Sequence, residues 1–226
     1  MKTRTETDSI GSLEVDEKAY YGVQTLRAHL NFPITGQKMS PSFLYHLALI
    51  KKAAAITNCE AGKLSESKRD AILEACDEVL AGKYQDQFIV DPILGGAGTS
   101  ANMNMNEVFA NRANEILGGE RGKYNFVHPN DDVNMSQSTN DVIPTAGKMT
   151  TLALLDPFEK ELTRLIQALR EKEKEFSHVL KMGRTQLQDA VPMTMGETFS
   201  SYASSMERGL KRIETASLEL TKINLG

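Results

Sequence analysis

The chain has 226 residues, of which 40% are hydrophobic and 25% are charged, as in an ordinary globular protein. Its net charge of −4 excludes the strongly basic surface of a nucleic-acid-binding protein. No apolar stretch approaches the roughly 18 residues of a membrane span, and the N-terminus lacks the apolar segment of a signal peptide. We therefore expect a cytoplasmic protein with no nucleic-acid or membrane partner.

Short extended pieces and loops are expected over residues 1–40, where glycine and proline interrupt every pattern. Ser40-Pro41 then has the form of an N-cap followed by proline at the first helical position. The helix that follows should bury one face, because its apolar residues recur at spacings of three and four. The members of that face are Leu44, Leu47, Ile50 and Ala54.

A second helix should begin at Ser65 and end near Gly82, a typical C-terminal stop. A third helix is expected over residues 106–117, closed by Gly118-Gly119. Both cysteines belong to helical patterns and neither lies in a CxxC motif, which indicates reduced packing thiols rather than a disulfide or a metal site.

The last third of the chain consists almost entirely of helix formers. One long helix should extend toward Ser177, with a kink or a brief interruption at Asp156-Pro157. A loop over residues 181–193 separates it from a final helix, whose first turn carries the capping-box pair Thr194 and Glu197. Long helices with one apolar stripe are typical of bundles and oligomers, since the stripe needs partners to cover it.

These patterns predict a mainly α protein with one domain boundary, near residues 138–141, where short helices give way to long ones. We expect an N-terminal domain over residues 1–138, mostly helical with short extended pieces. Residues 139–226 are expected to supply the first long helices of a helix bundle.

Three segments are rich in hydroxyl and amide side chains, and each is expected to open a helix. They are Gly95–Asn104, Asn130–Pro144 and Gly183–Pro192. Such a set suits an anionic substrate that is held by many hydrogen bonds rather than by one strong charge.

The glycines of the first segment permit close backbone approach, and Thr99 stands where the free N–H groups and positive dipole end of a helix point outward. A carboxylate or phosphate would fit there, and a plain capping loop is the alternative. The spacing matches neither a Walker A loop nor a dinucleotide fingerprint.

In the second segment Ser138, Thr139 and Asn140 stand in a row, although an ordinary N-cap needs only one such side chain. The row is therefore either an elaborate cap or part of a site. In the third segment Thr185 and Gln186 offer uncharged donors and acceptors. The alternative for Gln186 is an exposed amide.

Among the histidines, His128 is the candidate for the edge of a site, because it directly precedes Pro129-Asn130-Asp131. The other three are interpreted as surface or core residues. No HExxH pattern and no Cys/His cluster is present, so neither a metal nor another cofactor is expected. The pair Asp131-Asp132 is better explained as a partner of a helix dipole than as a metal ligand.

The three segments resemble the fumarase/aspartase superfamily, and the resemblance covers essentially the whole chain. It includes Tyr20–Arg27 and His128–Asn134 besides the segments themselves. Within the superfamily the aspartate ammonia-lyases are the most similar, since class II fumarases resemble Ser-Ser-Asn-Asp where this chain has Ser138-Thr-Asn-Asp141. Class II fumarases also carry a sequence similar to Arg-Thr-His at the position where this chain has Arg184-Thr-Gln186. A class II fumarate hydratase and an inert helical assembly module are the two alternatives.

The resemblance implies a carbon–nitrogen lyase that converts L-aspartate to fumarate and ammonia reversibly. It also implies a homotetramer built on a central helix bundle, with active sites shared between subunits. The implied substrate-binding residues come from all three segments: Thr99, Ser138, Thr139, Asn140, Thr185 and Gln186. Thr99, Ser138 and Thr139 would hold the β-carboxylate, with Asn140 near the amino group, and Thr185 and Gln186 would hold the rest of the substrate.

A second anion-binding patch is implied by the match of His128, Asn130 and Asp131 to fumarases. The general base of the family, a serine on a flexible Gly-Ser-Ser loop, has no counterpart in these 226 residues. We therefore assign no catalytic residue to this chain and interpret it as an N-terminal part with an incomplete bundle. On its own it is expected to be inactive.

Overall fold

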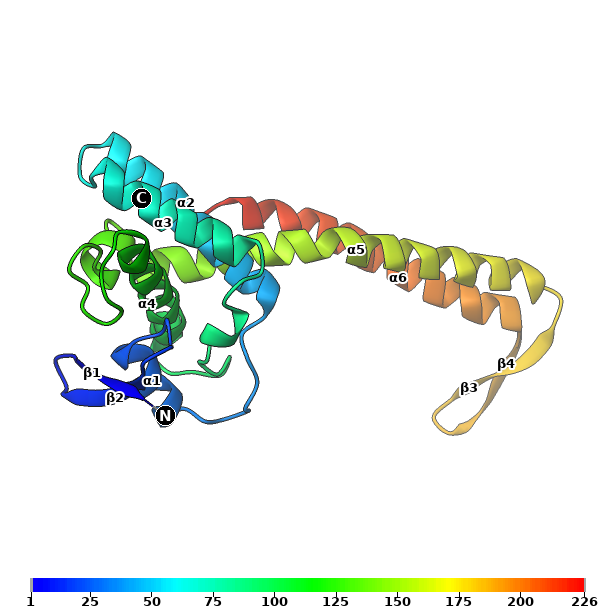
Figure 1. Cartoon of the computed structure of the whole chain (residues 1–226). Coiled ribbons are helices and arrows are strands. Elements are labelled where there is room, and N and C mark those ends of the chain that lie inside the picture. Colours follow the sequence, from blue (N-terminus) through cyan, green and yellow to red (C-terminus); the bar gives the residue numbers. More distant parts are fainter. Residues whose placement is uncertain (1, 226) are drawn as a thin grey trace. The chain divides into compact units, whose positions relative to one another are not determined.

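The computed structural model describes residues 2–225, most of which are helical, and this confirms the expected mainly α class (Figure 1). The chain divides into two compact units, Met1–Thr150 with Ile223–Gly226 and Thr151–Lys222. The boundary between domains 1–138 and 139–226 stays a prediction. No helix in the described part of the chain is both long and apolar enough to cross a membrane.

The first unit begins with a hairpin of two antiparallel strands, β1 (Thr3–Thr7) and β2 (Ser12–Asp16). Helix α1 (Val23–Asn31) follows. Because the sequence predicts only extended pieces and loops over residues 1–40, this helix corrects that prediction.

The first turn of α1 is capped from outside the segment. Gly22 occupies the N-cap position and has no side chain to accept a hydrogen bond. The buried carboxylate of Glu107 accepts instead from the backbone N–H of Gly22 at 2.8 Å and of Thr25 at 3.1 Å. That of Glu6 accepts from Val23 at 3.0 Å. Both acceptors are distant in sequence, so no local pattern announces the helix.

Helices α2 (Pro41–Glu60) and α3 (Glu66–Leu80) begin directly after Ser40 and Ser65, as predicted. The hydroxyl of Ser65 accepts a long hydrogen bond, 3.4 Å, from the backbone N–H of Lys68. The two helices contact each other and lie side by side in Figure 1.

The buried face of α2 differs slightly from the prediction. Leu44, Leu47 and Ile50 are buried as expected, whereas Ala54 is partly exposed and Ala55 is buried in its place. A buried row on α2 begins at Leu44 and continues at alternating spacings of four and three, and this row includes polar residues. Its members are Ala48, Lys51, Ala55 and Asn58.

Helix α4 (Thr99–Ile116) lies at the centre of the first unit and contacts α1, α2 and α3. The sequence predicts a helix over residues 106–117, so the observed helix begins earlier than expected. Its opening turns bury asparagines and methionines rather than one apolar stripe, and this conceals the helical period. The predicted stop is confirmed, since Gly118 has φ of +82°.

Several of the asparagines buried in α4 bond to the segments around it. The side-chain oxygen of Asn104 accepts from the backbone N–H of Ile89 at 3.0 Å. The side-chain nitrogen of Asn114 donates to the carbonyl of Val127 at 2.6 Å. These bonds satisfy polar groups that lack water and fix the loops on either side of the helix. Short helical turns lie at Gln85–Gln87, Gly96–Gly98, Pro129–Val133 and Leu218–Thr221.

Helix α5 (Thr139–Glu175) is continuous through Pro157, so an interruption at Asp156-Pro157 is wrong, while the alternative of a kink there stays a prediction. A proline removes only one backbone donor, and the remaining bonds of a long helix can bridge that loss. In the second unit α5 lies beside α6 (Met195–Ser217). The side chain of Arg170 on α5 donates across this contact to Ser204 at 3.1 Å and to Glu207 at 2.7 Å.

Residues 181–193, expected to form a loop, belong instead to an antiparallel hairpin of β3 (Leu180–Thr185) and β4 (Gln188–Thr194). The segment Gly183–Pro192 therefore does not open a helix. The two turn residues have positive φ, but neither is the asparagine or glycine that usually marks such a turn, so the hairpin is hidden in the sequence. The capping box of Thr194 and Glu197 on α6 is confirmed.

The crowding around Gly22 gives a stability test. A Cβ atom at this position would lie 2.5 Å from the Tyr124 hydroxyl and 2.7 Å from the Glu6 carboxylate. Gly22→Ala should therefore lower the free energy of unfolding by about 2 kcal/mol, as overpacking does. Urea unfolding followed by circular dichroism measures it. Gly147→Ala is the control, because a Cβ there meets nothing within 4 Å. Equal stability of the Gly22→Ala and unsubstituted chains would contradict the prediction.

Candidate functional site

The first turns of α4 and α5 meet in the first unit, and this brings two of the three polar segments together. A Cβ on Gly98, at the start of α4, would lie 2.8 Å from the Ile143 side chain of α5. The side-chain nitrogen of Asn102 lies 3.3 Å from the hydroxyl oxygen of Thr139. Gly98 is therefore required both by its φ of +93° and by the close approach of the two helices.

Thr99 lies on the exposed side of this junction. Its hydroxyl donates to the carbonyl of Gly96 at 2.7 Å, inside the glycine-rich turn. The hydroxyl oxygen keeps its lone pairs, and the N–H groups of the first turn of α4 lie beside it. The arrangement is that of a helix N-terminus suited to an anion.

Ser138 and Asp141 form a reciprocal cap at the start of α5. The Ser138 hydroxyl accepts from the backbone N–H of Asn140 at 3.2 Å, and the Asp141 carboxylate accepts from the backbone N–H of Ser138 at 2.8 Å. The elaborate cap considered from the sequence is thus present for these two residues. Thr139 and Asn140 are not needed for it, and the exposed side chain of Asn140 makes no hydrogen bond within residues 2–225.

Thr185 and Gln186 lie in the second unit, at the tip of the β3–β4 hairpin. Thr185 is the last paired residue of β3, opposite Gln188, and Gln186 is the first residue of the turn, with φ of +50°. Both side chains are exposed. The structure therefore joins Thr99 to the row Ser138–Asn140, while the third segment belongs to a separate unit.

Behind the junction lies a buried lysine that the sequence analysis missed. Lys51 on α2 is 0% exposed, and its ammonium nitrogen lies 2.8 Å from the side-chain oxygen of Asn134. Burial lowers the pKa of Lys51 from 10.5 to about 7. A signal was available, because Lys51 follows Leu44 and Leu47 at the spacings of a buried helical face.

The same side-chain oxygen of Asn134 accepts a second hydrogen bond, 3.0 Å long, from the side-chain nitrogen of Asn102. The side-chain nitrogen of Asn134 donates to the carbonyl of Gln137 at 3.1 Å. A chain of polar contacts thus runs from Lys51 through two amides to the backbone and hydroxyl of the row that begins α5.

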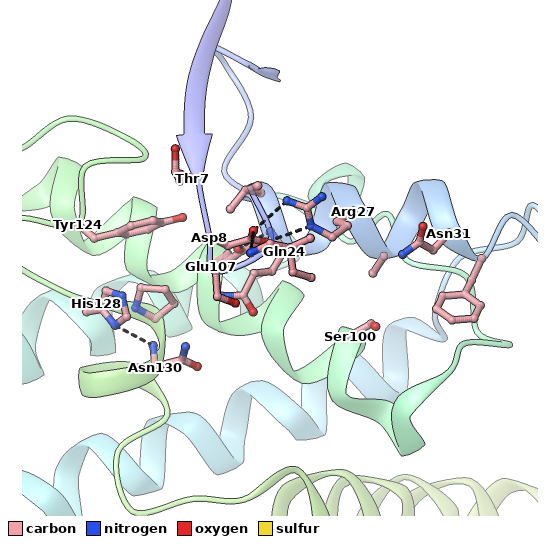
Figure 2. A pocket seen from close by; sticks show the side chains of 16 residues that line it. Thr7, Asp8, Gln24, Arg27, Asn31, Ser100, Glu107, Tyr124, His128 and Asn130 are labelled. Atoms are coloured by element: carbon pink, nitrogen blue, oxygen red, sulfur yellow. Dashed lines mark hydrogen bonds and ion pairs between the residues drawn. The ribbon is translucent and has the colours of Figure 1, made fainter. Parts of the chain in front are cut away.

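A cavity of about 550 Å³ in the first unit is lined by Ser100 of the first turn of α4 and by two residues of the expected second anion-binding patch (Figure 2). His128 and Asn130 form one part of its wall, whereas the exposed Asp131 does not line it. In Figure 2 the Arg27 side chain points toward Asp8 in the same cavity.

The charged and titratable side chains that line this cavity have hydrogen-bond partners within the chain. Arg27 and Asp8 form two hydrogen bonds, of 2.8 and 3.1 Å, and the arginine lowers the pKa of that carboxyl. Burial raises the pKa of the Glu107 carboxyl, although the backbone N–H groups of α1 oppose that shift. The ring nitrogen Nδ1 of His128 lies 3.3 and 3.2 Å from the backbone nitrogens of Asn130 and Asp131, so this histidine caps its own turn.

A family model described as Lyase matches residues 11–226. An aspartate ammonia-lyase of Pseudomonas canavaninivorans is 53% identical over 99% of this chain and 48% of its own length. A class II fumarate hydratase of Halobacterium salinarum is 47% identical over 99% of this chain and 47% of its own length. The chain thus spans about half the length of these relatives.

A solved structure has the same fold. It is the crystal structure of a fumarate lyase/delta crystallin from Brucella melitensis in native form, which is 47% identical. The TM-score is 0.89, and the match covers 99% of this chain and 53% of the other.

The buried Lys51 should make stability depend on pH. Because its pKa is lowered to about 7 by burial, the unfolded chain binds a proton that the folded chain releases above that pH. The free energy of unfolding should therefore rise with pH between about pH 7 and pH 8.5, by about 1 kcal/mol per pH unit. Above that window the buried Cys76 opposes the trend, since burial raises the pKa of its thiol.

Urea unfolding across this pH window measures the effect. Lys51→Met should remove the rise, and the neighbouring Lys52→Met should keep it, because Lys52 is half-exposed and paired with Asp77. A rise of equal slope in the Lys51→Met chain would contradict the assignment.

Proposed function

Since the chain belongs to the lyase family that residues 11–226 match, we propose that it is the N-terminal part of an aspartate ammonia-lyase. Such an enzyme releases ammonia from L-aspartate to form fumarate, and the reaction is reversible. The junction of the α4 and α5 first turns is the observation that best supports this proposal, since it joins hydroxyl groups to two helix N-termini.

The chemical difficulty of the reaction is a very weak carbon acid. Removal of a proton beside the β-carboxylate leaves a doubly charged aci-carboxylate, which needs donors already in position. Ser138 and Thr139 would donate to its oxygens, Thr99 would do so once its hydroxyl turns away from the Gly96 carbonyl, and the N–H groups of two helix starts would add positive potential. Asn140, whose side chain makes no hydrogen bond within residues 2–225, would contact the amino group.

The hairpin tip of the second unit carries the other residues that we propose to bind substrate. Thr185 and Gln186 are exposed and offer both donors and acceptors, so they suit the remaining polar groups of the substrate. The general base and a cation for the α-carboxylate would come from the half of the relatives' length that this chain does not span.

We also propose a homotetramer with active sites shared between subunits. Helices α5 and α6 of the second unit leave large apolar side chains exposed, among them Phe158, Leu165 and Tyr202. Apolar surface of this kind favours burial against further helices, as in a helix bundle.

Activity can be tested by joining residues 1–226 to the remaining half of the Pseudomonas canavaninivorans relative. The chimera should form fumarate, seen by ultraviolet absorbance, and release ammonia from L-aspartate, whereas residues 1–226 alone should form none. Malate as the dominant product from fumarate in the presence of both ammonia and water would favour the class II fumarase alternative. A folded but silent chimera would favour the inert assembly module.

Thr139→Val in the same chimera tests the proposed hydrogen bond from the Thr139 hydroxyl to the β-carboxylate of the substrate. Loss of one positioned donor should lower kcat about 10²- to 10³-fold. Thr5→Val is the control, since Thr5 is exposed on β1 and its hydroxyl donates to Glu14. Steady-state kinetics with L-aspartate decides the matter, and an unchanged kcat in the Thr139→Val chimera would remove Thr139 from the site.

A further inference from the structure

Lys51 is an unusual residue to bury, because a lysine without a carboxylate partner loses solvation and gains little in return. It is fully buried, and within residues 2–225 its ammonium bonds only to the neutral side chain of Asn134. An apolar residue at this place on α2 would cost less. We therefore look for a role of this lysine in the hydrogen bonds that continue from Asn134.

The direction of each hydrogen bond follows from Lys51 together with the Gln137 carbonyl, which accepts from the side-chain nitrogen of Asn134 at 3.1 Å. Its nitrogen donates, so the side-chain oxygen of Asn134, 2.8 Å away, must face it. Both the ammonium and the neutral amine carry the N–H that this bond needs. With that oxygen fixed, Asn102 must present its NH₂ group to Asn134, at 3.0 Å. The opposite orientation would place two oxygens against each other.

The same NH₂ group of Asn102 lies 3.3 Å from the hydroxyl oxygen of Thr139. Thr139 therefore accepts from Asn102, and its own hydroxyl hydrogen stays available for another acceptor. The buried side-chain oxygen of Asn102 has no hydrogen-bond partner among the described residues. An unpaired oxygen is costly, so its presence agrees with an orientation imposed by the neighbours rather than chosen by Asn102 itself.

We propose that Lys51 is a positioning residue that acts through Asn134 and Asn102 to make the Thr139 hydroxyl a donor toward the substrate carboxylate. This inference rests on the proposed function, in which Thr139 contacts the substrate. Without the lysine only the Gln137 carbonyl orients the Asn134 amide, so both amides rotate more readily, and Thr139 can then donate inward to Asn102 instead of outward to an anion.

A double-mutant cycle in the chimera tests the proposal. Lys51→Met alone should lower kcat/KM for L-aspartate about 10- to 100-fold. In a Thr139→Val background the same substitution should have almost no further effect, because both changes remove one donor. Lys51→Arg, whose guanidinium only donates, should retain most of the activity. Lys52→Met is the control and should match the unsubstituted chimera. Multiplicative losses in the double variant would overturn the proposal, since they indicate general structural damage.

A second measurement does not depend on turnover. In the ¹⁵N-labelled 226-residue chain, the side-chain NH₂ resonances of Asn102 should shift in both Lys51→Met and Thr139→Val and stay in place in Lys52→Met. Unchanged resonances in the first two variants would overturn the proposed positioning of Thr139 through Asn134 and Asn102. Shifted resonances together with a chimera that does not act on L-aspartate would support the hydrogen-bonded connection from Lys51 to Thr139 and refute the proposed function. If Lys51→Met does not fold by circular dichroism, Lys51→Arg and Thr139→Val still give the comparison.

Discussion

Polar side chains that are removed from water need hydrogen-bond partners, and helix α4 concentrates that requirement in the middle of the first unit. Its asparagines and Glu107 are buried, and Glu107, Asn104 and Asn114 bond to backbone groups of other segments. The packing of α1, of the loop before α4 and of the segment after it is thereby fixed by directional bonds as well as by apolar contact. Such bonds tolerate little displacement, so they set a single arrangement of these segments.

The same requirement shapes the candidate site. Asn102 stands one turn into α4 and joins the start of α5 to a lysine on α2. Three helices that each bury an apolar face are thus also connected through polar groups, at the point where two helix N-termini meet. Neutral donors in a rigid frame can hold negative charge without the strong attraction that would also retain a product.

Much of this was predictable from the sequence wherever the signal is local. Ser40-Pro41, Ser65, Gly118 and the Thr194 capping box all mark real helix ends, because capping depends on neighbouring residues. Helix α1 was missed because its cap comes from Glu6 and Glu107, and the early turns of α4 because a helix buried on all sides has no simple stripe. The β3–β4 hairpin was missed because its turn residues are atypical.

For the site, the sequence identified the hydroxyl and amide rows but not what holds them. The pairing of Ser138 with Asp141 as a cap, and the contact of Thr139 with Asn102, depend on distances that spacing cannot give. Lys51 was overlooked because a lysine is ordinarily a surface residue, and only the folded chain reveals that this one has no access to water.

The external capping of α1 also constrains the order in which the chain can acquire structure. A nine-residue helix is marginal in water, and this one receives its first-turn acceptors from a carboxylate more than eighty positions further along. During vectorial synthesis the N-terminal region must therefore emerge from the ribosome well before it can settle. It reaches its final conformation only when α4 arrives, so this early segment becomes ordered long after it has been made.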